Sequence, residues 1–235
     1  MTFNILTPAQ TVDISMDDGA IIRLRRHSKG KQRLLLSHGN GFAVDAYYPF
    51  WQLFLDSFEV VVFDVRNHGQ NPRHNFAAHH INRFVLDFET IYTHIPQIFG
   101  AKPTVAVFHS ISAITGLLQN LEHGQRWDAL LVVDPPVIPE PGHALYQLAH
   151  SFELKLRDWA VSRPHRFSSP NELTQTLIET KRLNRWQNGS HQLMAAATLT
   201  QNTTGWELTC PSTYESQIYD DNAKLNIWAQ LTELT

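Results

Sequence analysis

Ser110 is the residue of this chain whose type and surroundings suit a nucleophile. It follows an apolar, β-branched run at residues 104–108 and precedes an apolar helical pattern that begins at Ile111. A strand, a sharp turn and a helix with serine at the apex expose the hydroxyl above a sheet, beside the first N–H groups of the helix. Such a hydroxyl can attack an acyl carbon while the N–H groups stabilise the oxyanion. The alternative is an ordinary strand-to-helix junction in which the serine caps the helix.

The residues around Ser110 depart from the usual G-x-S-x-G pattern of such a turn. Phe108 and Ser112 occupy the two glycine positions. Small residues are favoured there because the turn brings strand and helix close together. Ser112 is small enough, but Phe108 is not, so we expect the strand to lean away from the helix or from its neighbour.

Two polar loops follow the apolar runs that precede Ser110. The run at 34–37 leads into His-Gly-Asn-Gly at 38–41, and the run at 60–64 leads into Asp-x-Arg-x-His-Gly at 64–69. The carboxyl ends of parallel strands share one edge of a sheet, so these loops should lie near Ser110. We expect His38, Asp64, Arg66 and His68 to organise the loops rather than to carry chemistry.

The order of short apolar runs and helical patterns predicts an α/β fold with a mostly parallel, doubly wound sheet. Residues 11–27 read as an antiparallel hairpin with its turn at Asp17-Asp18-Gly19. Strands and helices then alternate as far as Pro135-Pro136. The predicted strands span 34–37, 60–64, 104–108 and 129–134, and the predicted helices span 45–57, 80–99 and 111–122.

The last hundred residues differ from the rest in their pattern. They contain helix-like segments rich in large apolar and aromatic side chains, with no convincing parallel strand. We expect a helical lid over the active edge of the sheet. The predicted helices span about 143–161, 170–187, 190–200, 212–219 and 223–234.

Composition excludes several classes of protein. Of the 235 residues, 43% are hydrophobic and 17% charged, as in folded globular proteins. A formal net charge of −3 argues against a nucleic-acid partner. The single cysteine, Cys210, fits a reducing compartment. We expect no signal segment and no transmembrane segment, and therefore a cytoplasmic protein.

The three motifs occur in the order and spacing of the α/β-hydrolase superfamily, and the chain resembles its serine hydrolases. The resemblance covers residues 11 to about 137, and the remainder looks like the variable cap of that family. It implies an α/β-hydrolase core at 1–137, a helical cap at 138–222 and a helix returning to the core at 223–235. The fold expected from it is C-terminally incomplete.

The resemblance also implies a set of site residues. Ser110 takes the nucleophile position, and the backbone N–H groups of Asn40 and Ile111 would form the oxyanion hole. Asp134 stands where some members of the family place the acid, although Asp-Pro-Pro also suits a simple strand terminator. No cofactor and no metal site are implied.

The base that would activate Ser110 is missing from the expected place. In this superfamily the acid and then a histidine follow the serine, on loops after the last two strands. This chain has no histidine after His191. His143, His150 and His165 also lie in the expected cap, and each is more typical of surface or packing positions. Three interpretations remain: a truncated chain lacking its C-terminal strands, which we favour, a non-catalytic relative, or a catalyst with a rearranged base.

These features predict a hydrolase acting on an ester or related acyl bond of a small apolar substrate. The alternative is a catalytically impaired or truncated hydrolase-like protein that acts as a non-enzymatic binding module. Other chemistries on the same scaffold, such as cofactor-free oxygenation or C–C hydrolysis, stay open because fold does not choose among them. Without further strands, the predicted strand at 129–134 would be an exposed edge, so a homo-oligomer could form through it.

Overall fold

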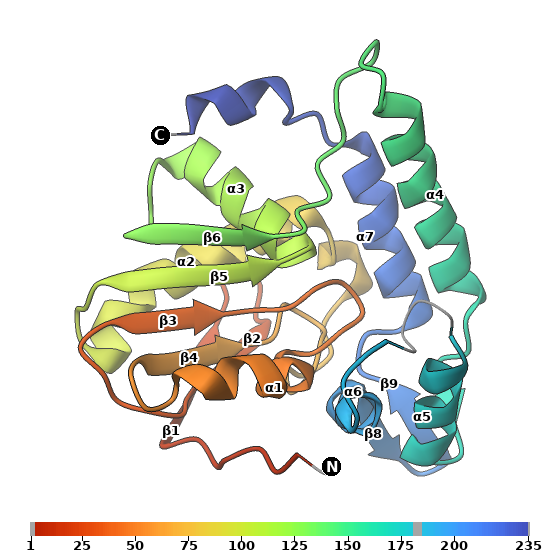
Figure 1. Ribbon diagram of the computed structural model, residues 1–235, viewed down its shortest axis with the longest axis horizontal. Helices are drawn as coiled ribbons and strands as arrows, with labels where there is room; N and C mark the ends of the chain where they lie inside the picture. Colours follow the sequence, from red (N-terminus) through yellow and green to blue (C-terminus); the bar gives the residue numbers. More distant parts are fainter. Residues whose placement is uncertain (1–2, 181–184, 235) are drawn as a thin grey trace.

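The computed structural model describes residues 3–180 and 185–234. Its centre is a six-stranded sheet in the order β1-β2-β4-β3-β5-β6 (Figure 1). The first two strands form an antiparallel hairpin, β2 pairs antiparallel with β4, and β3 to β6 run parallel. The strands span Gln10–Ser15 (β1), Ile21–Arg26 (β2), Arg33–Leu36 (β3), Glu59–Phe63 (β4), Thr104–His109 (β5) and Ala129–Val133 (β6). The predicted hairpin and parallel sheet are confirmed.

The sheet is covered on both faces, and its central strands β3 and β4 are accordingly apolar after their first residue. Every residue of β3 and β4 is buried. Helices α2 (Ile81–Phe99) and α3 (Ile111–His123) lie on one face. The other face is covered by α1 (Tyr48–Trp51), flanked by 3-10 turns η1 (Val44–Tyr47) and η2 (Gln52–Phe54). The helix predicted over 45–57 is therefore broken into three short pieces (Figure 1).

Phe108 fits beside the serine turn because the helix, not the strand, makes room for it. Its ring is fully buried and packs edge-on against Phe63, with Phe88 beside them. A Cβ at Gly116 of α3 would lie only 2.8 Å from the Phe108 ring. The missing side chain at Gly116 thus takes over the role of the glycine that normally precedes the serine.

Residues 146–224, called the cap segment or cap below, contain a small sheet as well as helices. Its helices are α4 (Tyr146–Ser162), α5 (Pro170–Glu179), α6 (Ser190–Thr198) and α7 (Ser212–Lys224). Three short antiparallel strands pair in the order β7-β9-β8: Arg166–Phe167 (β7), Leu199–Asn202 (β8) and Gly205–Leu208 (β9). The sequence did not predict them, because strands of two to four residues carry too little alternation to be distinguished from loops.

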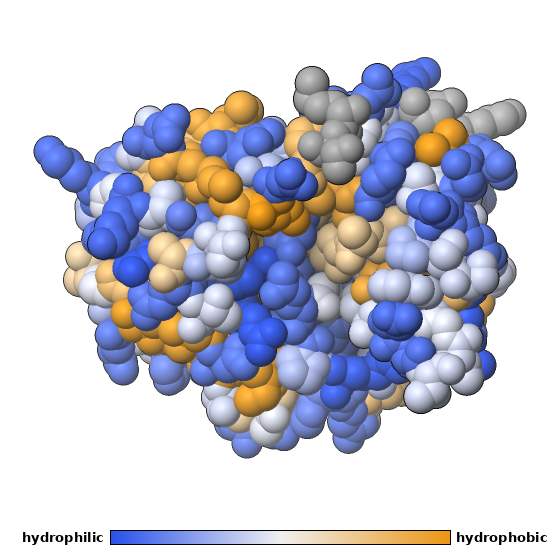
Figure 2. Space-filling model, turned by 90° about the horizontal axis from the view of Figure 1, so that it is seen from below, coloured by the Kyte–Doolittle hydropathy of each residue, from blue (hydrophilic) through white to orange (hydrophobic). Residues whose placement is uncertain are grey.

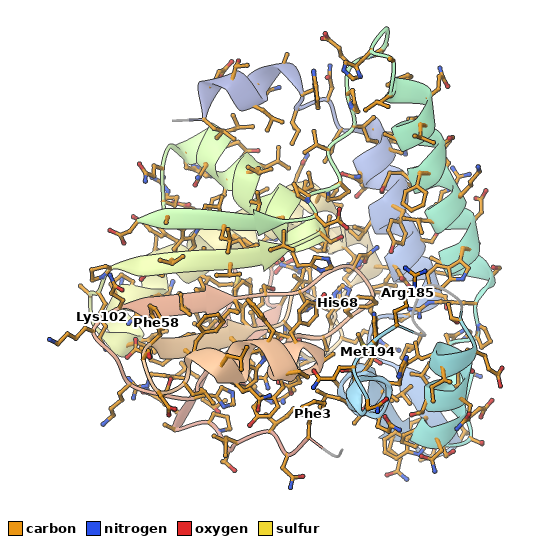
Figure 3. All side chains as sticks on the ribbon, in the orientation of Figure 1. Phe3, Phe58, His68, Lys102, Arg185 and Met194 are labelled. Atoms are coloured by element: carbon orange, nitrogen blue, oxygen red, sulfur yellow. The ribbon has the colours of Figure 1, made fainter. Side chains whose placement is uncertain are left out.

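The cap covers the carboxyl ends of the parallel strands, and α4 and α7 lie side by side there (Figure 1). His68 marks this end of the sheet, and Met194 and Arg185 of the cap face it, whereas Lys102 and Phe58 lie at the opposite end (Figure 3). Functional residues of such sheets gather where the strands end. The cap therefore encloses the edge that carries Ser110.

Two predicted helices end differently in the structure. The helix expected over 170–187 ends at Glu179, and residues 181–184 of that prediction lie outside the described residues. The segment at 223–234 is not one helix: Lys224 closes α7, and a separate 3-10 turn, η4 (Ala229–Glu233), contacts α3. In the described part of the chain, no helix combines the length and apolar character that a membrane crossing needs.

The outer edge of β6 is open. Within residues 3–180 and 185–234, the sheet order ends at this strand. Leu131 and Val133 are 53% and 44% exposed, on a strand of five apolar residues. Such an edge presents unpaired N–H and C=O groups to any strand that approaches it. The exposed edge expected from the sequence is therefore present in the described residues.

Candidate active site

Ser110 sits at a strained turn between β5 and α3. Its backbone has φ 54° and ψ −115°, a conformation that residues with a side chain rarely adopt. The Ser110 N–H donates to the carbonyl of Val133 on β6 at 2.9 Å. The residue occupies the position that precedes α3, yet its side chain makes no capping hydrogen bond to that helix. The geometry is that of a serine hydroxyl held at the apex of a turn rather than that of a helix cap.

Ser112 fastens the same turn from inside the helix. Its fully buried hydroxyl donates to the carbonyl of His109 at 2.9 Å and lies 3.0 Å from the His109 N–H, which donates to it. A glycine here would leave both backbone groups without this partner. The serine at the second glycine position therefore stabilises the turn instead of only fitting it.

In the loop after β3, the backbone N–H of Asn40 lies between those of Gly39 and Gly41, which both donate to side chains. The Gly39 N–H donates to the Tyr47 hydroxyl at 3.1 Å, and the Gly41 N–H donates to Nε2 of His68 at 3.1 Å. The Asn40 N–H lies between them. As the first residue of α3, Ile111 also carries an N–H without a partner inside its helix. These are the two donors that the family resemblance assigns to an oxyanion hole.

This loop touches the serine turn directly. A Cβ at Gly39 would lie 3.1 Å from Cβ of Ser110 and 2.8 Å from Nδ1 of His109. Glycine is thus required for the close approach of the two segments. The Tyr47 hydroxyl lies 2.7 Å from Nδ1 of His109, so it links the loop and the turn.

The cap holds the same loop from the other side. Nδ2 of Asn40 donates to the carbonyl of Glu215 on α7 at 2.8 Å. Gly41 has φ +71°, and a Cβ there would collide with the Glu215 carboxylate. Glu215 is 2% exposed on its side chain and forms an ion pair with Arg163. The position of the Asn40 N–H therefore depends on α7 as well as on β3.

Asp64 braces the two loops against each other. Its carboxylate accepts from the N–H groups of Val44 at 2.8 Å and Gln70 at 3.1 Å, and it pairs with buried Arg25 at 3.2 Å. His38 Nε2 lies 3.4 Å from the same carboxylate. These contacts assign Asp64 an organising place in the loops, in line with the sequence analysis.

The two loop histidines are held in the neutral form that these contacts need. Burial lowers the pKa of His38 to about 3 and that of His68 to about 3. A neutral imidazole has one nitrogen that can accept, and Nε2 of His38 accepts from the Val65 N–H at 3.0 Å. His68 accepts from Gly41 in the same way. Both rings therefore act as fixed acceptors for backbone groups.

The four residues named as site residues from the sequence meet at one cavity of about 230 Å³. Asn40, Ser110, Ile111 and Asp134 all line it. Asp134 follows β6 and also has a positive φ of 48°. Apolar side chains from the loop after β6 and from α4 and α7 form part of the other walls: Val137, Ile138, Ala149, Phe152, Leu156 and Ile218. Glu153 of α4 and Tyr219 and Asn222 of α7 also line the cavity, so it has a mixed polar and apolar lining.

No histidine is among the described residues that line this cavity. His109 turns to the other side of the turn, where it lines a second cavity of about 310 Å³ with aromatic residues including Phe42 and Trp186. Burial lowers the pKa of His109. The ring of His109 therefore faces a different cavity from the one that Ser110 lines.

On the face seen in Figure 2, apolar residues form a band across the upper part, above a hollow lined with polar residues.

Glu153 is a cavity residue that sequence reasoning missed. It lies in the middle of α4, is 5% exposed and lines the cavity with Ser110. Burial raises its pKa to about 7, against a hydrogen bond with Asn222, and Asp134 raises it further. In the sequence it looks like one more polar residue of an amphipathic helix. Only the packing of α4 against α7 reveals that it faces inward.

Comparison of the whole fold with solved structures gives many similar chains. An E-2-(acetamidomethylene)succinate hydrolase is similar at a TM-score of 0.74 and 14% identity, over 93% of this chain and 75% of that chain. The thioesterase domain from the curacin biosynthetic pathway gives 0.72 and 15%, over 95% and 78%. An esterase from Exiguobacterium antarcticum gives 0.65 and 14%, over 98% and 78%. At these identities the likeness shows the fold alone.

Sequence comparison adds the family. No curated protein matched the chain. The family model Hydrolase_4, described as serine aminopeptidase, S33, matches residues 28–207. This match includes the loops after β3 and β4, the serine turn and most of the cap. Because it spans well over half of the sequence, the chain belongs to this hydrolase family, and its fold is that of the α/β-hydrolase superfamily.

Proposed function

We propose that this protein is a serine hydrolase that cleaves an ester or related acyl bond of a small apolar substrate. The observation that carries the proposal is the strained turn at Ser110, which shares a cavity with Asn40, Ile111 and apolar side chains of α4 and α7. The N–H groups of these two residues are the proposed oxyanion donors. Each such donor stabilises the transition state by about 3 kcal/mol in well-studied hydrolases.

The proposed reaction has two steps. Oγ of Ser110 forms a bond to the acyl carbon, the bond to the leaving oxygen breaks, and the proton of the hydroxyl passes through a base to that oxygen. Water then attacks the acyl carbon, the bond from that carbon to Oγ of Ser110 breaks, and a proton of the water passes through the base to Oγ, so that the acid leaves and the hydroxyl is restored. Asp134 lines the cavity and is the proposed acid member, which would orient and stabilise the protonated base.

A second candidate function is a binding module that holds a small apolar ligand without cleaving it. It is favoured by the lack of a histidine among the described residues that line the cavity. A serine hydroxyl is a weak nucleophile until a base accepts its proton. The two candidates share the cavity and differ only in whether Ser110 is activated.

A fluorophosphonate separates the two candidates, because it forms a covalent bond only with an activated serine. We expect it to label the folded wild-type chain at Ser110 and to leave Ser110→Ala unlabelled, as read by intact-mass spectrometry. Ser151→Ala, which removes a hydroxyl from the cap helix α4, should be labelled like the wild type. Folded wild-type protein that stays unlabelled and does not turn over short p-nitrophenyl esters would establish the binding module instead.

We also propose that two copies of the chain associate through the open edge of β6. A two-fold axis would pair the two edges antiparallel and bury Leu131 of both copies, which is 53% exposed in one copy. Leu131→Lys should therefore shift the sedimentation coefficient from dimer to monomer. Leu148→Lys changes a leucine on α4 that is 69% exposed, more than Leu131, and should leave the dimer intact. A monomeric wild type at high concentration would contradict the proposal.

A further inference from the structure

Two carboxyl groups line the cavity in front of Ser110, and no cationic side chain is found among the lining residues that the structure describes. Glu153 comes from α4 of the cap, and Asp134 follows β6 of the core. Neither lysine nor arginine is among the described lining residues. The arginines close to these helices are already paired, Arg157 with Asp220 and Arg163 with Glu215. A ligand that enters this space therefore meets acidic groups without a protein counter-charge.

Glu153 is built into the wall rather than extended into solvent. It is 95% buried, since only 5% of the residue is exposed. Asn222 of α7 lies beside it and acts to lower its pKa, and Nδ2 of Asn222 donates to the carbonyl of Pro136 at 2.9 Å. This chain of contacts links α4, α7 and the loop after β6. The carboxyl group is thus held at a fixed place in the cavity.

We propose that Glu153 makes this cavity select uncharged substrates, such as apolar esters and amides, and exclude substrates that carry a carboxylate beside the reacting bond. Protonated Glu153 donates a hydrogen bond to a neutral carbonyl oxygen. Ionised Glu153 repels a carboxylate, and no described lining cation offsets the repulsion. The inference rests on the proposed function because it assigns a substrate class to the same cavity.

The protonation state of Glu153 sets the pH range in which the selection changes. The titratable groups that face it are Asp134 from the core and Tyr219 from α7. Burial and the nearby Asp134 raise the pKa of Glu153 to about 7. Below this pH the group is neutral and tolerates an anion. Above it the group is charged, so the affinity for a carboxylate falls by up to tenfold for each pH unit.

Equilibrium binding of two matched ligands tests the selection without any need for turnover. Hexanamide and hexanoate have the same chain and differ in charge, and their dissociation constants can be measured by NMR titration. At pH 8 we expect the wild type to bind hexanamide at least tenfold more tightly than hexanoate. Between pH 8 and pH 6 the affinity for hexanoate should rise about tenfold, because Glu153 becomes protonated.

Two variants assign the effect to Glu153. Glu153→Gln should reduce the preference at pH 8 to less than threefold and remove the pH dependence. Asp158→Asn removes the same charge from an exposed position of α4 and should behave as the wild type. Equal affinities in the wild type at pH 8, no binding of hexanamide, or an unchanged preference in Glu153→Gln would each overturn the proposal. Labelling of Ser110 is measured separately, so a selective but unlabelled protein would contradict only the proposed catalysis.

Discussion

Replacing Arg66 with methionine should lower the free energy of unfolding by about 3–5 kcal/mol, the usual effect of removing one member of a buried ion pair. Arg66 is 1% exposed on its side chain. Its guanidinium binds both oxygens of Asp87 on α2, at 2.7 and 2.8 Å, and reaches Asp18 in the hairpin turn at 2.7 Å. Methionine fills similar space but leaves Asp87 buried without this partner. Urea unfolding followed by circular dichroism measures the change.

The hairpin β1–β2 contains a matched control for this substitution. Arg23 binds both oxygens of Asp13, at 2.7 and 2.8 Å, with the same two-bond geometry as Arg66 with Asp87. The side chains of this pair are 33% and 42% exposed. Arg23→Met should therefore cost less than about 1 kcal/mol. Similar losses for both variants would show that burial does not set the value of the Arg66 pair.

The same arginine shapes the response of the fold to acid. Burial is the largest single influence and acts to raise the pKa of Asp18. The hydrogen bonds from Arg66 and from the Ala20 N–H, together with the charges of Arg66 and Arg83, outweigh it and hold that pKa at about 2. A depressed carboxyl pKa adds stability above the unfolded value near 4, and this stability is lost as pH falls toward 2. In Arg66→Met the free energy of unfolding should therefore depend less on pH between about 4 and 2. The reason is that Arg66, in the loop after β4, binds both Asp18 of the hairpin turn and Asp87 of α2.

The core of the fold could be predicted because its strands are short apolar runs separated by helical patterns. The serine turn and the two polar loops were recognisable from residue type and order. Residues of the serine turn and of the loop after β3 line one cavity, whereas the loop after β4 braces the loop after β3 through Asp64 and His68. The space that Phe108 needs was not predictable. It depends on Gly116, eight residues further along, and only the packing of α3 on β5 brings the two together.

The cap could be predicted only in outline. Its helices follow from large apolar side chains at helical spacing, but β7 and β9 consist of two and four residues and show no clear alternation. Glu153 was missed for a related reason. A single glutamate on an amphipathic helix gives no sign of its burial, which arises from the contact between α4 and α7. Local patterns therefore identified the chemistry of the core, while the selectivity proposed for the cap depends on tertiary packing.

Ser110→Gly should make the chain more stable than Ser110→Ala while both variants lose all labelling by a fluorophosphonate. With φ 54° and ψ −115°, Ser110 holds a conformation that costs a residue with a Cβ about 1–3 kcal/mol. Glycine adopts it without that strain, although its greater freedom in the unfolded chain offsets up to about 1 kcal/mol of the gain. Alanine lacks the hydroxyl and keeps the strain, so the comparison isolates the backbone. We expect the free energy of unfolding, measured with urea, to be about 1–2 kcal/mol higher for Ser110→Gly than for Ser110→Ala.

A serine in a regular helix should respond in the opposite direction. Ser151 lies inside α4, where glycine weakens a helix, so Ser151→Gly should lose about 0.5 kcal/mol. A gain at position 110 together with a loss at position 151 would show that the turn stores strain in the native state. If Ser110→Gly were no more stable than Ser110→Ala, the turn would not be strained. The stored strain matters because it keeps the hydroxyl exposed at the cavity and prevents it from relaxing into a helix cap.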